Sequence, residues 1–306
     1  MLSKKEIDSR ISKLPRIIHV AQETLDEVAL MMRAERKNHA ERKGAITKES
    51  HQSIQTVMDI EAQNIILQEM RNEFPEMLII TEEEVGINFE NSLATEKDIS
   101  EGKLIMVIDP LDGTAQYFSG LDQFSVSLGI IENGKYVGGV ICSPVFGGGF
   151  TVYGTINEGS FVKHGGIDSV ARVSHKKGEI NQSVILYGVD LPRRKNLYNL
   201  LNRVSIQSLV ANSMGSCALG LAMLAIGKVD GFVQSLQYPW DWAAGYPLLL
   251  GAGGYISFYE IGLEGEIIIV ERPNPKYMVK KGKEFGFVAA NSLALLEQLQ
   301  EMLVGE

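Results

Sequence analysis

The sequence predicts a layered α+β fold that passes into an α/β pattern within one chain of 306 residues. Three observations support this class: amphipathic helices open the chain, antiparallel hairpins occupy its middle, and strands alternate with helices from about residue 181. Because 45% of the residues are hydrophobic, the chain can bury a sizeable core. We expect an antiparallel-rich N-terminal lobe over residues 1–180 and a mixed-sheet C-terminal lobe over residues 181–306.

The N-terminal part predicts two helices, each with apolar residues at helical spacing. One helix covers residues 17–38, and the other covers 54–74 and stops before Pro75. The polar segment 39–53 between them predicts a loop. The segment 77–84, MLIITEEE, predicts a short strand that ends in acidic residues.

The middle of the chain predicts two hairpins. Asn133-Gly134 joins the two β-rich runs of residues 124–144, and this dipeptide is typical of a two-residue hairpin turn. A second hairpin covers residues 148–166. Beyond residue 181 we expect strands at 183–189 and 230–236, and helices at 193–204, 217–227, 242–254 and 292–304, the last with Asn291 as its N-cap.

Charge and hydropathy indicate which kinds of partner and which cellular location to expect. The net charge is −9, and no basic stripe with interleaved aromatic residues suggests a nucleic-acid polymer as partner. The first residues carry no apolar run of a secretory signal, and no apolar stretch is long enough to span a bilayer, so we expect a cytoplasmic protein without a membrane partner. Cys142 and Cys217 offer neither zinc-ligand spacing nor a disulfide framework and are interpreted as small buried residues.

Two apolar strands end in acidic residues in the same manner. The run LIMVI leads into Asp109 and Asp112, which we expect to be held across a proline-stiffened turn, and TEEE ends the strand before it. One such cluster alone is an ordinary solvated turn, but two carboxylates at the end of a buried strand need neutralisation. Divalent hard cations prefer carboxylate and carbonyl oxygens, and a pair of such ions needs a bridging carboxylate. The segment Thr114–Phe118 predicts one helical turn whose first amides favour phosphate, so the pattern indicates a phosphoester site.

Two other motifs fit this segment less well. An aspartyl-phosphate phosphatase carries its acids two residues apart, whereas Asp109 and Asp112 are three apart with Pro110 between them. A calcium loop needs alternating acids that end in a glutamate, and the sequence lacks that run.

Three motifs in order, TEEEVG, DPLDGTAQYF and PWDWAAG, resemble those of the inositol monophosphatase family. The superfamily comprises magnesium-dependent, lithium-sensitive phosphatases and includes fructose-1,6-bisphosphatase and the 3'-phosphoadenosine nucleotidases. The resemblance covers residues 20–295 and includes GSCALGLAMLAIGKVDGFV and GAGG in the second half. It implies an αβαβα layered sandwich, two or three Mg²⁺ ions and a homodimer.

The resemblance also assigns roles to residues of this chain. Glu82, Thr114 and Asp59 are implied in catalysis, with Thr114 orienting the attacking water and Asp59 accepting its hydrogen bond; Glu83 is the second candidate of the acidic pair. The implied metal ligands are Glu82, Asp109, the Leu111 carbonyl, Asp112 and Asp241. The implied phosphate- and substrate-binding residues are Asp112, Gly113, Thr114, Gly215, Ser216, Cys217, Gln234 and Asp241.

Two positions depart from the family's usual pattern. Gln234 stands where members that act on inositol phosphate usually carry glutamate, seven residues before Asp241, and GTAQYF has Gln116 and Tyr117 where the signature usually has Asn before Phe. We expect a Mg²⁺-dependent phosphomonoesterase that acts on a small phosphorylated metabolite, an inositol-1-phosphate-like sugar or polyol phosphate. A 3'(2'),5'-bisphosphate nucleotidase or fructose-1,6-bisphosphatase is the alternative within enzymes, and a non-catalytic scaffold that binds metal or phosphometabolites is the alternative of another class.

Overall fold

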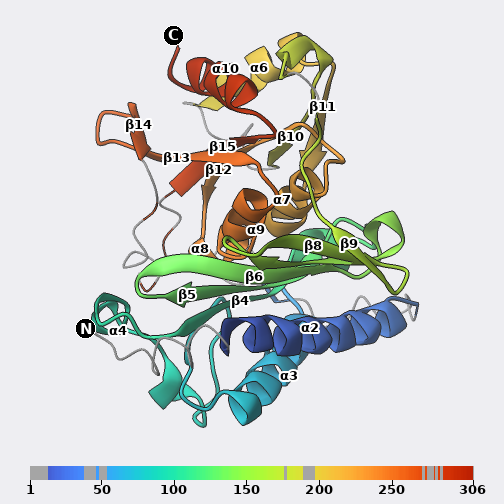
Figure 1. Ribbon diagram of the computed structural model, residues 1–306, viewed down its shortest axis with the longest axis vertical. Helices are drawn as coiled ribbons and strands as arrows, with labels where there is room; N and C mark the ends of the chain where they lie inside the picture. Colours follow the sequence, from blue (N-terminus) through green and yellow to red (C-terminus); the bar gives the residue numbers. More distant parts are fainter. Residues whose placement is uncertain are drawn as a thin grey trace.

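Five layers of helices and sheets make up the protein (Figure 1). The computed structural model describes residues 13–37, 46–47, 54–175, 178–188, 197–270, 273, 279, 282 and 285–305. The α-helices are α2 Lys13–Lys37, α3 Val57–Glu73, α4 Glu96–Ser100, α5 Thr114–Phe118, α6 Tyr198–Gln207, α7 Cys217–Ala225, α8 Pro239–Trp242, α9 Gly245–Gly251 and α10 Leu293–Val304. Helices α2 and α3 form one outer layer, α7, α8 and α9 lie between the two sheets, and α6 and α10 form the other outer layer. The predicted αβαβα class is confirmed.

The first sheet is antiparallel apart from one pair of strands. Its strands are β3 Leu78–Thr81, β4 Ile105–Asp112, β5 Ser125–Glu132, β6 Lys135–Ser143, β7 Phe150–Thr155, β8 Gly159–His164 and β9 Ile167–Val170. They lie side by side in the same order as in the sequence. Only β3 and β4 run parallel. Both predicted hairpins are confirmed, and Asn133 and Gly134 have φ values of 52° and 66°, as a two-residue hairpin turn with left-handed central residues requires.

The second sheet is mixed, as predicted. Its strands are β10 Val184–Gly188, β11 Val210–Met214, β12 Gly231–Gln237, β13 Tyr255–Ile261, β14 Ile267–Val270 and β15 Phe285–Ala290, in the order β11-β10-β12-β15-β13-β14. Strand β10 is parallel to β11 and β12, and the remaining pairs are antiparallel. The boundary expected at residue 180 lies between β9 and β10, and so between the two sheets.

Several element boundaries differ from the sequence predictions. Helix α3 begins at Val57 because Thr56 caps it, and Ile54–Gln55 pair instead with Ile46–Thr47 as the short strands β2 and β1; the rest of segment 39–53 lies outside the described residues. The helix predicted over 242–254 is two helices, α8 and α9. The N-cap of α10 is Ser292, whose Oγ accepts from Leu295 N at 3.3 Å, and not Asn291, which donates to Ser174 Oγ at 2.7 Å.

Three apolar clusters hold the layers together. One lies between α2, α3 and the first sheet, a second between the two sheets around α7 and α9, and a third between the second sheet and α6 and α10. Two glycines let the middle layer approach the first sheet: a Cβ at Gly129 would lie 2.7 Å from the Ala243 carbonyl carbon, and one at Gly139 would lie 2.8 Å from the Ala244 Cα. The α8–α9 junction therefore rests directly on β5 and β6. No helix among the described residues is long and apolar enough to cross a membrane.

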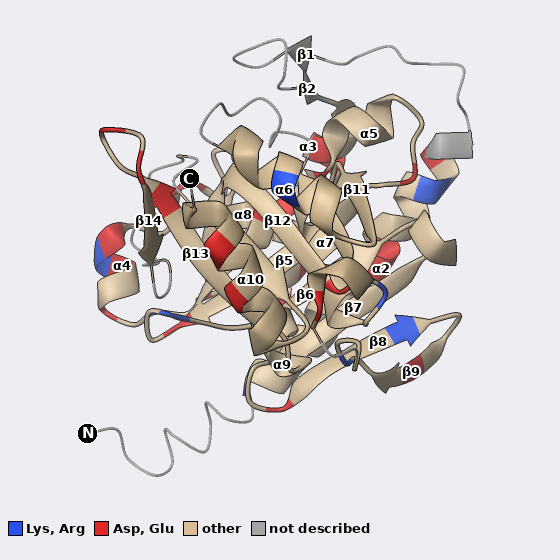
Figure 2. Ribbon diagram, turned by 90° about the horizontal axis from the view of Figure 1, so that it is seen from above, with Lys and Arg blue, Asp and Glu red and all other residues tan. Residues whose placement is uncertain are grey.

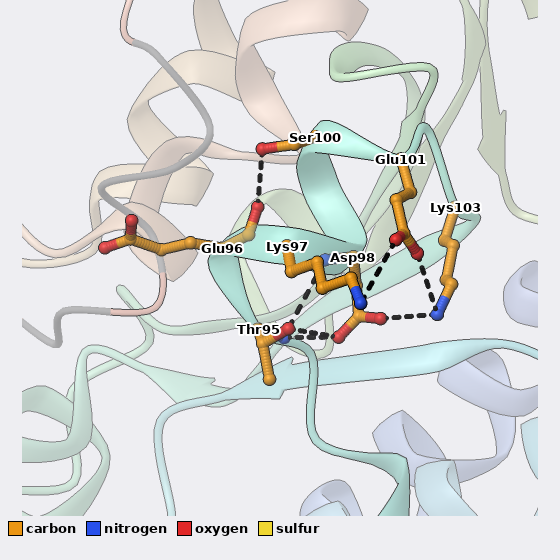
Figure 3. A network of polar contacts seen from close by, with 7 residues as sticks. All are labelled: Thr95, Glu96, Lys97, Asp98, Ser100, Glu101 and Lys103. Atoms are coloured by element: carbon orange, nitrogen blue, oxygen red, sulfur yellow. Dashed lines mark hydrogen bonds and ion pairs between the residues drawn. The ribbon is translucent and has the colours of Figure 1, made fainter.

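A capped short helix leads the chain into β4 (Figure 3). Thr95 N donates to Asp98 Oδ2 at 2.8 Å, and Asp98 N donates to Thr95 Oγ1 at 3.3 Å, which is the capping box of α4. Lys103 Nζ lies 2.6 Å from Asp98 Oδ1. The bond from Lys103 and those from Thr95 lower the pKa of Asp98 to about 2.

Asp98→Asn is expected to reduce the free energy of unfolding at pH 7 by about 1 kcal/mol or less, because the pair with Lys103 is screened by solvent. The pKa of Asp98 is lower in the folded protein than in the unfolded chain, so its contribution is complete above about pH 4 and is lost as the pH falls toward about 2. Chemical denaturation at pH 7 and pH 3 measures the difference. Glu96→Gln on the same helix, whose carboxylate points away from the network in Figure 3, is the control. An equal effect of Asp98→Asn at both pH values would contradict the assignment.

Candidate active site

A bulge in β4 brings Asp109 and Asp112 to the same face of the first sheet. Asp109 lies opposite Ser127 on β5 and Asp112 lies opposite Ser125, so the two β4 residues between the acids stand opposite the single residue Val126 on β5. In a regular strand, residues three apart point to opposite faces, and the extra residue corrects this. The sequence analysis expected a proline-stiffened turn here; β4 instead continues through Pro110 to Asp112.

Asp241 reaches the same place from the second half of the chain. It lies in α8, which directly follows β12, and its Oδ2 accepts from Tyr238 N at 3.0 Å. One carboxylate oxygen from each of Asp109, Asp112 and Asp241 lies within 4.8 Å of the others. The contact of α8 and α9 with β5 and β6 therefore closes a three-carboxylate cluster between the two sheets.

Glu82 adds a fourth acidic group beside this cluster. It follows β3, the parallel neighbour of β4, and its amide donates to Ile108 O at 3.3 Å. Its charge raises the pKa of Asp109. The two neighbouring glutamates differ from it, since Glu83 is buried and Glu84 is exposed. Of the three, Glu82 is therefore the one whose charge acts on Asp109.

Burial and mutual repulsion disfavour charge in the cluster. Asp109 is 1% exposed, and burial, followed by the charges of Glu82, Asp112 and Asp241, raises its pKa well above the usual range. Burial also raises the pKa of Asp112 to about 6, although hydrogen bonds from Ser216 and from the amides of Ala218 and Cys217 lower it. Within the described residues, no cationic side chain contributes to either shift. The hydrogen bonds at Asp109 and Asp112 therefore come from serine and from backbone amides.

The turn after Asp112 requires a glycine. Gly113 has a φ of 93°, and a Cβ there would lie 2.8 Å from Gln123 O and 3.2 Å from Ser216 Cβ. It begins the predicted single helical turn, α5 Thr114–Phe118. The chain can therefore turn sharply between the acids and Thr114.

Thr114 and Asp59 form a polar pair at the edge of the cluster. Thr114 Oγ1 lies 3.2 Å from Asp59 Oδ1 and 3.0 Å from Leu111 O. Asp59 is fully buried in the first turn of α3, where its Oδ2 accepts from Thr56 N at 2.7 Å and from Thr56 Oγ1 at 2.6 Å. The capping box of α3 thus fixes the carboxylate that faces Thr114.

The residues assigned to the substrate side lie inside the protein. Gly215, Ser216 and Cys217 lead into α7, and the buried Ser216 Oγ donates to Asp112 Oδ2 at 2.7 Å. Gln234 is buried on β12, where its Oε1 accepts from Ser235 N at 3.1 Å and its side chain bonds the Cys217 thiol. Burial and the charges of Asp112 and Asp241 raise the pKa of Cys217 well above its usual range. Both cysteines are free and buried, as predicted.

The donor set suits hard divalent cations. The three clustered carboxylates, Glu82 and the Leu111 carbonyl offer only oxygen, which is what Mg²⁺ prefers. Burial, and then the negative charges of Glu82, Asp112 and Asp241, raise the pKa of Asp109, and a bound cation would offset those charges. The residues present therefore fit the predicted magnesium centre.

Comparison with known proteins agrees with this geometry. A family model described as the inositol monophosphatase family matches residues 13–299. This chain belongs to the inositol monophosphatase family. Within that family, the fructose-1,6-bisphosphatase/inositol-1-monophosphatase of Thermotoga maritima is 32% identical over 212 residues, which are 69% of this chain and 73% of that protein. The Nus factor SuhB of Escherichia coli is 29% identical over 221 residues, which are 70% of this chain and 76% of that protein.

Solved structures of family members share the fold. An IMPase of Thermotoga maritima superposes with a TM-score of 0.70 at 26% identity, covering 92% of this chain and 94% of that one. The extragenic suppressor protein SuhB of Bartonella henselae gives a TM-score of 0.74 at 22% identity, covering 95% and 99%. The family contains proteins named for a phosphatase activity and proteins named otherwise, so membership supports phosphatase chemistry without naming a substrate.

Three supporting groups were missed in the sequence. The amide of Ala218 donates to Asp112 Oδ2 at 2.5 Å, and Ser125 Oγ lies 2.9 Å from Ser216 Oγ. Gln63 on α3 donates to Glu84 O at 3.0 Å and accepts from Thr81 Oγ1, which fastens the acidic segment after β3. Ala218 and Gln63 carry no acidic or metal-ligand signature, and only the register of β4 and β5 reveals Ser125.

The free energy of unfolding of the metal-free protein is expected to fall as the pH rises from about 4 to above 6. The folded pKa of Asp112, about 6, lies above its unfolded value of 3.8, so the folded state binds more protons in this window. The loss for Asp112 is on the order of 3 kcal/mol. Asp112→Asn should flatten the profile, whereas Glu264→Gln, at an exposed acid in the β13–β14 turn, should not. Thermal unfolding in EDTA from pH 4 to 8 measures this.

Mg²⁺ should raise the unfolding temperature more at pH 8 than at pH 5, because it replaces the bound protons. A Mg²⁺ effect that is independent of pH and survives Asp112→Asn would contradict a metal site at these acids.

Proposed function

We propose that the protein is a metal-dependent phosphomonoesterase that acts on small phosphorylated metabolites. The observation that carries the proposal is the cluster of Asp109, Asp112 and Asp241, in which the first two acids are buried and the third is partly buried. Among the described residues, no cationic side chain offsets the charge of Asp109 or Asp112. A structural role would not call for three such acids with carboxylate oxygens within 4.8 Å of one another. Membership of the inositol monophosphatase family supports the same chemistry.

The metal ligands in this proposal are Glu82, Asp109, the Leu111 carbonyl, Asp112 and Asp241, which would hold two or three Mg²⁺ ions. Bound Mg²⁺ would supply positive charge against the phosphate and lower the pKa of a coordinated water. Asp109 and Asp112 lie on one bulged strand and Asp241 lies on a separate helix, so these ligands would reach a bound ion from two elements. Their positions are fixed before the substrate arrives, and such preorganisation is what phosphoryl transfer requires.

Thr114 orients the attacking water in this mechanism. When its hydroxyl donates to Asp59 Oδ1, at 3.2 Å, its lone pairs are free to accept a hydrogen bond from a water molecule. Asp59 is fixed by Thr56 and can therefore hold Thr114 in that state. The pair thereby orients the water through a hydrogen bond, and no serine or cysteine nucleophile is needed.

Phosphate would lie between the metal ligands and the turn at Gly113 and Thr114. We place the alcohol part of the substrate against Gly215, Ser216, Cys217 and Gln234, and we propose a sugar or polyol phosphate of the inositol-1-phosphate type. The Gln234 amide can both donate to and accept from a hydroxyl. The name of the Thermotoga maritima relative, which combines fructose-1,6-bisphosphatase and inositol-1-monophosphatase, supports this substrate class.

Two other functions define alternative outcomes. A 3'(2'),5'-bisphosphate nucleotidase or a fructose-1,6-bisphosphatase would use the same metal cluster with another alcohol. A scaffold that binds metal or phosphometabolites without turnover is favoured by one observation, the similarity to proteins named Nus factor SuhB. With the phosphatase we also propose a homodimer, a cytoplasmic location and inhibition by lithium.

Purified protein should release phosphate from inositol 1-phosphate in the presence of Mg²⁺, and faster than from adenosine 3',5'-bisphosphate or fructose 1,6-bisphosphate. Colorimetric phosphate release at equal substrate concentrations measures the three rates. Preference for one of the other two would replace the proposed substrate class. EDTA or Asp112→Asn should abolish release, and Mg²⁺ binding without turnover of any phosphomonoester would identify a scaffold.

Thr114→Val is expected to lower kcat by about 10²-fold with little change in KM, because it removes the hydroxyl that aims the water and leaves the metal ligands intact. Thr24→Val is the control, since the Thr24 hydroxyl also donates to a backbone carbonyl, that of Val20 at 2.9 Å on α2, far from the acidic cluster in sequence. A kcat for Thr114→Val equal to that of the control would remove Thr114 from the mechanism.

A further inference from the structure

Two buried hydroxyl groups lead from β5 to the carboxylate of Asp112. Ser125 Oγ lies 2.9 Å from Ser216 Oγ, and Ser216 Oγ lies 2.7 Å from Asp112 Oδ2. Both serines have 0% of their surface exposed. The two hydroxyl groups therefore form a chain to Asp112, which is 8% exposed, without contact with solvent of their own.

The direction of this chain follows from counting protons. A serine hydroxyl has one proton and two lone pairs. Ser216 Oγ accepts from Leu219 N at 3.1 Å, because Ser216 is the N-cap of α7, and its proton points to Asp112. One lone pair remains, and Ser125 is the group that fills it. Ser125 is thus the donor to Ser216, and Ser216 is the donor to Asp112.

One carboxylate oxygen of Asp112 is held by hydrogen bonds within the protein. Oδ2 accepts both from Ser216 Oγ and from Ala218 N, at 2.7 and 2.5 Å. Oδ1 takes part in neither of these two bonds, and the amide of Cys217 also donates to this carboxylate. A carboxylate held in this way keeps one orientation toward a bound cation.

The position of Ser125 explains why it can serve this purpose. It lies directly opposite Asp112 in the β4–β5 pairing, on the C-terminal side of the bulge. Ser216 lies at the end of the second sheet's β11 and begins α7. The hydroxyl pair therefore links β5, the neighbour of the bulged strand β4, to a helix that the second sheet positions.

We propose that Ser125 is a positioning residue for metal binding: by donating to Ser216 it fixes the orientation in which the Asp112 carboxylate meets a cation. The inference rests on the proposed function, because it assumes that Asp112 binds a cation. Ser125 itself touches neither metal nor substrate.

Ser125→Ala tests the proposal. It is expected to weaken Mn²⁺ binding, measured by calorimetry or electron paramagnetic resonance without substrate, by about five- to tenfold, as the loss of one buried hydrogen bond implies. The Mg²⁺ concentration for half-maximal activity should rise by the same factor, with a smaller change in kcat. Ser160→Ala is the matched control, since Ser160 on β8 is equally buried and its hydroxyl donates to Leu248 O on α9 at 2.7 Å.

A double-mutant cycle separates positioning from stability. Ser125 acts only through Ser216, so Ser125→Ala should change Mn²⁺ affinity little in a Ser216→Ala background. Thermal unfolding of each variant checks that it is folded. Mn²⁺ binding by Ser125→Ala equal to that of the Ser160→Ala control, or additive effects in the cycle, would overturn the inference. Wild-type protein that binds Mn²⁺ but hydrolyses no phosphomonoester would overturn only the proposed function, and wild-type protein that binds no divalent cation would overturn both.

Discussion

Repulsion among buried carboxylates is the constraint on which the rest of this structure depends. Asp109 and Asp112 lie on the first sheet, and Asp241 follows a strand of the second, so the association of the two sheets is what brings like charges together. Apolar contacts around α7 and α9 hold the sheets against that repulsion. Hydroxyl and amide donors orient the acids but cannot neutralise them. Without a cation, the folded state therefore stores unfavourable electrostatic energy at its centre.

Two local irregularities make this arrangement possible. The bulge between Asp109 and Asp112 turns both side chains to one face, and Gly129 and Gly139 let the α8–α9 junction approach closely enough to deliver Asp241. A regular strand would point one acid away, and a side chain at either glycine would collide with backbone of the middle layer. Figure 2 shows that Lys and Arg residues are dispersed over the described ribbon and do not form a continuous stripe, so local backbone geometry, and not a basic patch, shapes the site.

Sequence patterns predicted the parts of the fold that have strong local signals. The Asn133-Gly134 turn, the amphipathic α2 and the layered class are of this kind, and the motifs around Asp109 and Asp241 brought together residues that are 132 positions apart in the chain (241 minus 109). Strand β11 was missed because it lies at a sheet edge and most of its residues are exposed, so its apolar residues do not alternate with polar ones; β15 was missed because it is buried throughout and does not alternate. Ser125 could not be found without the register of β4 and β5, since a serine in a strand has no signature of its own. Turns, helices and acidic motifs can be predicted from the sequence, whereas contacts between residues of neighbouring strands can be found only in the folded structure.

The cost of the acidic cluster also bears on whether this chain is an enzyme or a scaffold. Removing one of several like charges from a buried site relieves desolvation and repulsion, so a purely structural protein would be more stable with an amide at Asp109 or Asp112. This chain keeps both acids and surrounds Asp112 with three donors, Ser216 and the amides of Ala218 and Cys217, that favour its charged form. Asp59, held by Thr56 against Thr114, adds a second oriented carboxylate that a binding site for metal alone would not need. Unfavourable energy held in place by specific supporting bonds is typical of a site that does chemistry, and the Thr114–Asp59 pair is consistent with the proposal that this chemistry uses a water molecule.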